Sequence, residues 1–225
     1  MKRKKELLSG IKCVVFDIDG TLMDSIPRIV ECIGLSCKKH NIEVPSQQAC
    51  FNVIGLGLNL AIQQVIPNES ADTQALVAET YRMTYTELED AKPTELFPCA
   101  LDVIKKLKEN GIKIAVATGK SMKGWNRVAK YAHLEEYVDY VVTADTAISK
   151  PNNQMLRKIS DSLKLPIKSC VMVGDSTLDI QMAINANMPN VAVTTGVHTK
   201  EQLYNCKADF VVDDLSSILD LLDLK

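Results

Sequence analysis

Six short apolar runs, rich in valine and isoleucine, recur along the chain and constrain its fold more than any other feature. They occupy residues 11–16, 112–117, 140–142, 170–173, 191–193 and 210–212. A short unbroken apolar run bounded by polar residues is typical of a strand buried on both faces. Helical patterns separate the runs, as in residues 100–110, where the period is kept by Leu101, Ile104, Leu107 and Lys108. This alternation predicts an α/β fold with a doubly wound parallel sheet.

The first connection between runs is much longer than the others. About 95 residues separate Phe16 from Ile112, whereas a crossover with one helix needs about 20 to 30. Residues 27–89 show helical patterns and no convincing strand. The apolar face of the first pattern contains Ile29, Ile33, Ser36 and Cys37, and further helical stretches are expected at Leu60–Val65 and Leu76–Tyr85.

We therefore expect a small α-helical cap domain inserted into an α/β core. The cap would comprise residues 24–94, and the core residues 1–23 plus 95–225. Hinges are expected at 24–27 and 91–98, because prolines there interrupt helical continuation.

The overall composition narrows the kinds of partner. Among 225 residues, 26 basic and 28 acidic side chains leave a net charge of -2, which favours neither nucleic acid nor an anionic membrane surface. The basic start, residues 1–5, is interpreted as a solvated terminus. Seven scattered cysteines without a C-x-x-C pair favour reduced, packing thiols and a cytoplasmic location. Either a monomer or a homodimer is compatible with these features.

Polar residues follow four of the predicted strands. In chain order they are Asp17-Ile18-Asp19-Gly20-Thr21-Leu22, Thr118-Gly119-Lys120, Lys150-Pro151 and Gly174-Asp175-Ser176 with Asp179 shortly after. Ligands of an open parallel sheet bind beyond the carboxyl ends of its strands. We therefore expect four carboxylates, a hydroxyl group and a lysine around one crevice.

Carboxylates crowded at one edge repel one another unless a cation lies between them. Oxygen ligands without histidine or cysteine favour Mg²⁺. Each segment also has an ordinary structural interpretation. Asp19-Gly20 could form a turn, Gly174-Asp175-Ser176 could cap a helix, and Thr118-Gly119 could simply end a strand.

The ordered set of motifs resembles the haloacid dehalogenase superfamily. The matching motifs are Asp17-x-Asp19-x-Thr21-Leu22, Thr118, Lys150-Pro151 and Gly174-Asp175-x-x-x-Asp179. Similarity to the phosphoglycolate phosphatase and pyrophosphatase branch comes from Val53-Ile54-Gly55-Leu56, Leu96-Phe97-Pro98 and Ala117-Thr118-Gly119-Lys120-Ser121. The chain departs from that branch at Asn152-Asn153-Gln154 and at Ala186-Asn187-Met188. The helical insertion is similar to the family's cap.

The resemblance implies catalytic roles for two aspartates and metal binding by four. Asp17 would be the nucleophile that forms an aspartyl-phosphate, and Asp19 the general acid and base. The metal would be Mg²⁺, bound by Asp17, Asp175, the backbone carbonyl of Asp19 and, directly or through water, Asp179. The second aspartate of the first motif favours phosphate chemistry over carbon–halogen cleavage.

The resemblance also implies a phosphate-binding set and a substrate class. Thr118, Gly119 and Lys150 would hold the transferring phosphoryl group, with Lys120 as a competitor for the role of Lys150. The implied function is Mg²⁺-dependent hydrolysis of a small phosphorylated metabolite, with phosphoglycolate first and then pyrophosphate or a sugar phosphate.

Two alternative functions remain open: a phosphomutase resembling beta-phosphoglucomutase, and a non-catalytic regulatory protein with the same fold. Other notable residues receive no catalytic role. Trp125 and Met122 are interpreted as packing, and Gly55-Leu56-Gly57-Leu58 as a substrate-facing loop or a hinge. No role is assigned to His40, His133 and His198.

Overall fold

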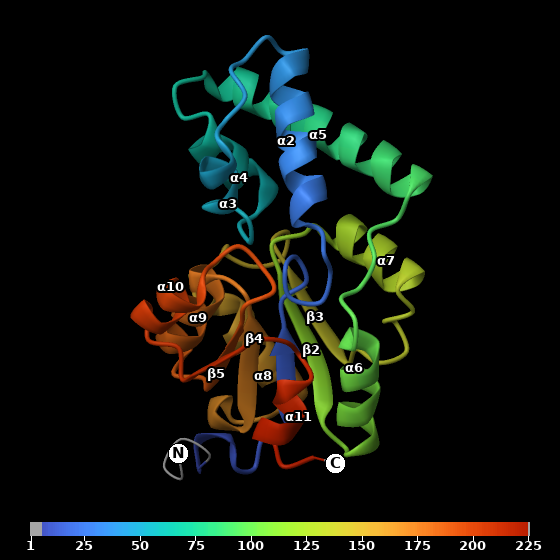
Figure 1. Ribbon diagram of the computed structural model, residues 1–225, viewed down its shortest axis with the longest axis vertical. Helices are drawn as coiled ribbons and strands as arrows, with labels where there is room; N and C mark the ends of the chain where they lie inside the picture. The colour runs from blue at the N-terminus through green and yellow to red at the C-terminus, as the bar shows by residue number, and fades with distance from the viewer. Residues whose placement is uncertain (1–5, 225) are drawn as a thin grey trace.

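The computed structural model describes residues 6–224, and in them one parallel sheet forms the centre of the fold (Figure 1). Its order is β3-β2-β1-β4-β5-β6. The strands are β1 (Cys13–Phe16), β2 (Lys113–Thr118), β3 (Tyr140–Thr143), β4 (Cys170–Gly174), β5 (Asn190–Val193) and β6 (Phe210–Val212). All six predicted strands are confirmed, with ends shifted by two residues at most. The basic segment at residues 1–5 lies outside the described residues.

Helices cover both faces of the sheet, because successive strand residues point to opposite faces. Val14 and Phe16 pack on the side of α6 (Ala100–Glu109), α7 (Met122–Tyr131) and α11 (Ser217–Leu221). Cys13 and Val15 pack on the side of α8 (Gln154–Leu163) and α9 (Thr177–Ala186), and α10 (Lys200–Asn205) covers β5 on that face. Two short 3-10 turns, η1 (Glu6–Leu8) and η2 (Ile167–Ser169), precede β1 and β4. The doubly wound prediction is confirmed.

The packing of α6 corrects one sequence prediction, and the packing of α7 confirms another. Lys108, placed in the apolar stripe of α6 from the sequence, instead forms an ion pair with Asp139, while Val103 is buried. Trp125 is buried in the core beneath α7, with Met122 packed against that core. The packing interpretation of this pair is therefore confirmed.

Four helices between β1 and β2 lie over the carboxyl edge of the sheet (Figure 1). They are α2 (Ile26–Lys39), α3 (Gln47–Phe51), α4 (Leu58–Val65) and α5 (Ala71–Ala91). They share an apolar core of their own, and Ser36 and Cys37 are buried on α2 as the sequence predicted. Helix α5 extends beyond the predicted stretch at both ends. Within residues 6–224, no helix combines the length and the apolarity that crossing a membrane requires.

The two linkers to these helices run beside each other. Met23 and Leu96 form an antiparallel bridge, and the Phe97 amide donates to the Leu22 carbonyl at 2.9 Å. Pro27 was expected to interrupt a helix, and that expectation is wrong. It lies in the first turn of α2, where the missing N–H of proline leaves no hydrogen bond unmade.

Candidate active site

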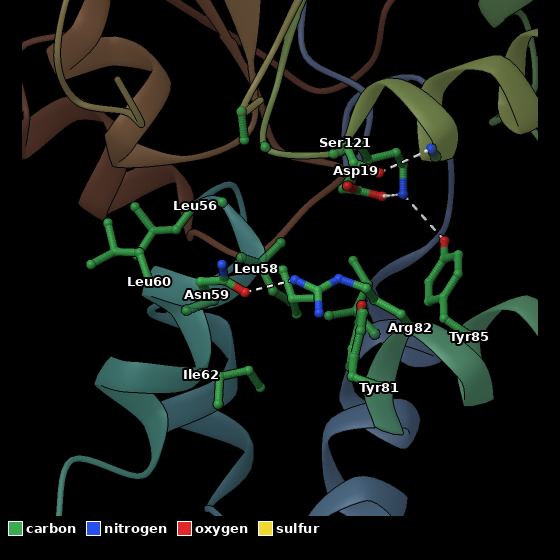
Figure 2. A pocket seen from close by; sticks show the side chains of 18 of the residues that line it. Asp19, Leu56, Leu58, Asn59, Leu60, Ile62, Tyr81, Arg82, Tyr85 and Ser121 are labelled. Atoms are coloured by element: carbon green, nitrogen blue, oxygen red, sulfur yellow. Dashed lines mark hydrogen bonds and ion pairs between the residues drawn. The ribbon is translucent and has the colours of Figure 1, made fainter. Parts of the chain in front are cut away.

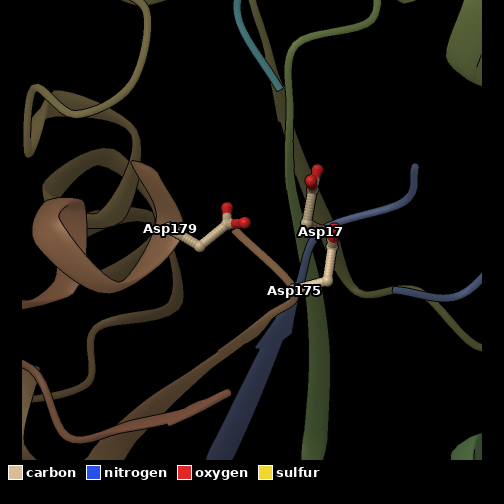
Figure 3. Close-up of side chains that lie close together, drawn as sticks. All are labelled: Asp17, Asp175 and Asp179. Atoms are coloured by element: carbon tan, nitrogen blue, oxygen red, sulfur yellow. The ribbon is translucent and has the colours of Figure 1, made fainter. Parts of the chain in front are cut away.

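Three predicted site residues meet at the carboxyl edge of the sheet. Asp17 follows β1, Asp175 follows the adjacent strand β4, and Asp179 lies in the first turn of α9. One carboxylate oxygen of each lies within 4.8 Å of the others, and all three residues are buried. Figure 3 shows Asp179 projecting from its helix toward the other two. The structure thus brings together three of the four carboxylates that were expected around one crevice.

Lys150 places a positive charge inside this cluster. Its ammonium lies 2.8 Å from Asp17 Oδ1 and 2.7 Å from Asp179 Oδ1, and its side chain is fully buried. Burial lowers the pKa of Lys150, but the two carboxylates outweigh burial and raise the pKa above its ordinary value. The two carboxylates therefore favour the charged form of Lys150.

Asp175 is held by a cradle that the sequence did not reveal. Its Oδ1 accepts a hydrogen bond from the Thr21 hydroxyl at 2.8 Å, and its Oδ2 accepts one from the Val197 amide at 3.0 Å. A Cβ atom on Gly196 would lie 1.7 Å from Asp175 Oδ2, and one on Gly20 would lie 2.5 Å from the same oxygen. Both glycines are needed for this close approach. The signal in the sequence for the contact between Gly196 and Asp175 was a glycine shortly after β5.

Asp179 serves both structural and electrostatic purposes. Its Oδ2 accepts hydrogen bonds from the Ser176 amide at 3.2 Å and the Ser176 hydroxyl at 2.6 Å, completing a capping box at the start of α9. Its Oδ1 faces Lys150. The helix-cap interpretation is thus correct for Ser176, while Asp175 remains outside the cap.

The side chain of Asp19 has partners of its own, outside the three clustered carboxylates. Its Oδ1 accepts a hydrogen bond from the Ser25 hydroxyl and lies 2.7 Å from the Lys120 ammonium. Lys120 also donates to the Tyr85 hydroxyl of α5 at 3.2 Å. The sequence identified Lys120 only as a competitor of Lys150, and Ser25 and Tyr85 were missed because their proximity to Asp19 is a tertiary contact.

Thr118 and Gly119 lie at the end of β2, the neighbour of β1. The Thr118 hydroxyl is buried and accepts a hydrogen bond from the Lys120 amide at 3.2 Å. A Cβ atom on Gly119 would lie 2.5 Å from the Leu56 carbonyl oxygen and 2.6 Å from that of Gly55. The glycine loop, residues 55–58, therefore packs directly against the end of β2.

Buried charges at the site do not balance. Four aspartates are buried at the site: Asp17, Asp19, Asp175 and Asp179. Lys150 contacts Asp17 and Asp179, Lys120 contacts Asp19, and no further lysine contact is present among these groups in the described residues. Full ionisation leaves an excess of two negative charges, which one divalent cation would neutralise.

The pKa values reflect this excess. Burial raises the pKa of Asp17 well above its ordinary range, with Lys150 opposing the rise and neighbouring carboxylates adding to it. Burial, and then Asp179, raises the pKa of Asp175 to about 7. Three clustered carboxylates with unmet negative charge fit Mg²⁺, a hard cation that prefers oxygen ligands.

A cavity of about 690 Å³ adjoins Asp19 between the sheet edge and the helices above it. Figure 2 shows Arg82 of α5 reaching Asn59 of α4, while the hydroxyl of Tyr85 points toward the side of Asp19 and Ser121. Most of the wall is apolar, including Leu56, Leu58 and Leu60. The cavity lies in the range of about 300–1,000 Å³ that is usual for small-molecule sites. The glycine loop, 55–58, lines it.

The fold and the site together define an α/β enzyme with an acidic centre at the carboxyl edge of its sheet. Residues 14–193 match the family model of haloacid dehalogenase-like hydrolases. The chain belongs to this family, and it is a hydrolase of that fold.

Two curated relatives match nearly the full chain. A protein named "Putative pyrophosphatase PpaX" from Caldanaerobacter subterraneus is 32% identical, over 94% of this chain and 94% of its own length. A phosphoglycolate phosphatase from Aliivibrio fischeri is 25% identical, over 97% of this chain and 99% of its own length.

A solved structure supports the fold. The crystal structure of a predicted phosphoglycolate phosphatase from Haemophilus somnus has a TM-score of 0.86 at 23% identity and covers 95% of this chain and 99% of its own. At that identity the likeness concerns the fold alone.

Proposed function

We propose that the protein is a Mg²⁺-dependent phosphatase that hydrolyses small phosphate monoesters through an aspartyl-phosphate on Asp17. The observation that carries this proposal is the excess of two negative charges among the buried aspartates and lysines of the site. The relatives named as phosphoglycolate phosphatase and pyrophosphatase support phosphate chemistry. Phosphoglycolate is the first candidate substrate, followed by pyrophosphate and sugar phosphates.

Asp17 would attack the phosphorus in line while Lys150 compensates the negative charge that develops on the phosphoryl oxygens. The 2.8 Å contact between Asp17 and Lys150 holds both groups at one point, and a fixed buried cation stabilises the transition state more than a solvated one. Thr118 and the Gly119 amide would complete the phosphoryl site. Water then hydrolyses the aspartyl-phosphate, so that one difficult step becomes two easier ones.

Asp19 would protonate the leaving alkoxide and later accept a proton from the attacking water. Its separation from the three clustered carboxylates suits this role, because a proton donor must face the leaving group rather than the metal. Bound at Asp17, Asp175, Asp179 and the Asp19 carbonyl, Mg²⁺ would supply Lewis-acid stabilisation of the phosphoryl oxygens.

Residues 24–94 would act as a cap domain over a core of residues 1–23 and 95–225. The separate apolar core of α2 to α5 and the paired linkers support this division. A cap at this position would exclude water from the reacting ester.

The proposal is tested by following release of inorganic phosphate from a panel of phosphate esters. Purified protein stripped of metal is assayed with and without Mg²⁺. Metal-dependent release from at least one small monoester is expected. Isomerisation of a sugar phosphate without net phosphate release would instead identify a phosphomutase, and metal binding without turnover of any ester would identify a regulatory protein.

A further inference from the structure

Lys120 places a buried positive charge on the cavity wall beside Asp19. Its side chain is only 9% exposed. It lies on the loop between β2 and α7, whereas Lys150 lies on the loop after β3 and contacts the clustered carboxylates. Lys120 therefore lies at the end of the site that holds Asp19, and Lys150 at the end that holds the three clustered carboxylates.

We infer that Lys120 is a specificity-determining residue that binds a carboxylate carried by the leaving group. This inference rests on the proposed function, in which Asp19 protonates the ester oxygen. An ester oxygen within reach of Asp19, about 2.6–3.2 Å, lies near the ammonium that contacts the same carboxyl group at 2.7 Å. A carboxylate attached to the ester carbon then falls within reach of Lys120. The substrate class is the phosphorylated 2-hydroxy acids.

The ammonium retains capacity for such a ligand. A lysine ammonium has three N–H donors. Among the described residues, two acceptors contact it, Asp19 Oδ1 and the Tyr85 hydroxyl. The third donor is available to an acceptor in the cavity that Lys120 lines.

Other basic groups on the cavity wall are less suited to this role. Arg82 forms an ion pair with Glu79 and donates to Asn59, and Arg127 donates to Thr86. Lys123 is exposed to solvent, which weakens any ion pair that it forms. Among these basic side chains, Lys120 is therefore the one that a short leaving group held at Asp19 would contact.

The test compares two esters with the same two-carbon chain, 2-phosphoglycolate and 2-hydroxyethyl phosphate. The first ends in a carboxylate and the second in an alcohol. For Lys120→Met we expect kcat/KM to fall roughly 10- to 100-fold more with 2-phosphoglycolate than with 2-hydroxyethyl phosphate. Loss of a hydrogen bond between charged groups has this size. The matched control Lys123→Met removes an exposed cation from the same wall and should leave the ratio of the two kcat/KM values unchanged.

The outcomes separate this inference from the proposed function. Equal losses with both esters in Lys120→Met would overturn it, since Lys120 would then act only by positioning Asp19. Because Lys120→Met could fold poorly, the wild-type protein provides a second measurement: no preference for 2-phosphoglycolate over 2-hydroxyethyl phosphate would also overturn the inference, with phosphatase activity intact. Wild-type protein that releases phosphate from no ester would overturn the proposed function and this inference with it.

Discussion

The two ends of the site differ in how they are built. In the proposed mechanism the phosphoryl end would consist of Asp17, Asp175, Asp179 and Lys150, all buried and all supplied by loops and helix starts at the sheet edge. The leaving-group end would consist of Asp19, Ser25, Lys120 and Tyr85. It combines the sheet edge with the linker before α2 and with α5 itself.

Under the proposed mechanism, this difference would separate reaction chemistry from substrate selection. Groups on adjacent parallel strands are positioned by the sheet, which is rigid and closely packed. The leaving-group end depends on how the helices α2 to α5 lie over that sheet. We therefore expect changes at the phosphoryl end to affect every substrate, and changes at the leaving-group end to alter the choice of substrate.

The largest effect is expected from Asp17→Asn at the phosphoryl end. The amide keeps the size of the carboxylate but is a poor nucleophile, so kcat/KM should fall on the order of 10⁴-fold or more. Phosphate release in the presence of Mg²⁺ measures the loss, and an unchanged circular dichroism spectrum shows that the variant is folded. A rate close to that of the wild-type protein would remove Asp17 from the nucleophile role.

Lys150→Met should have the next largest effect and should not discriminate between substrates. Loss of one group that stabilises transition-state charge costs about 10²- to 10³-fold in kcat. The fall should be similar for 2-phosphoglycolate and 2-hydroxyethyl phosphate, unlike the selective loss expected for Lys120→Met. A selective loss in Lys150→Met would contradict the division of the site into two ends.

Gly119→Ala tests the contact between the sheet edge and the helices above it. The added Cβ would clash with the carbonyl oxygens of Leu56 and Gly55, so the glycine loop must shift. A shift of about 1 Å in a site can cost up to about 10²-fold in rate. The matched control is Gly34→Ala in α2, where the added Cβ meets only Val44 at 3.5 Å, and its kcat/KM should equal that of the wild-type protein. Equal kcat/KM values in Gly119→Ala and Gly34→Ala would show that the contact between Gly119 and the glycine loop does not affect the reaction rate.

The smallest effect is a change in stability on binding metal. At a Mg²⁺ concentration 100 times the dissociation constant, binding stabilises the folded protein by about 2.7 kcal/mol. That corresponds to a rise of about 5–10 °C in Tm for a chain of this size. A chelator first removes bound metal, and thermal unfolding then gives Tm with and without added Mg²⁺. The rise in Tm should be lost in Asp175→Asn. An equal rise in this variant would place the cation elsewhere.

Local pattern was sufficient to predict the strands and the residues that follow them. Unbroken apolar runs identify strands buried on both faces, and a parallel sheet brings all their carboxyl ends to one edge. The sequence alone therefore places Asp17, Thr118, Lys150 and Asp175 at one edge. Their individual roles in the reaction remain predictions.

Contacts between distant segments could not be predicted in the same way. Gly196 lies against Asp175, and Tyr85 reaches Lys120 from a helix in the inserted segment. The interruption expected at Pro27 was wrong because the position of a proline in a helix depends on where the helix begins. None of these relations leaves a periodic signal in the chain.

The sequence by itself determined the α/β class, the inserted helices and the acidic residues at the strand ends, because hydrophobic period and turn residues act over short distances along the chain. Only the tertiary structure decided that Asp17, Asp175 and Asp179 meet at one point, with Lys150 between Asp17 and Asp179, while Asp19 pairs with Lys120. Direction and partner of a side chain depend on the packing of segments far apart in sequence, and that packing is a property of the whole fold.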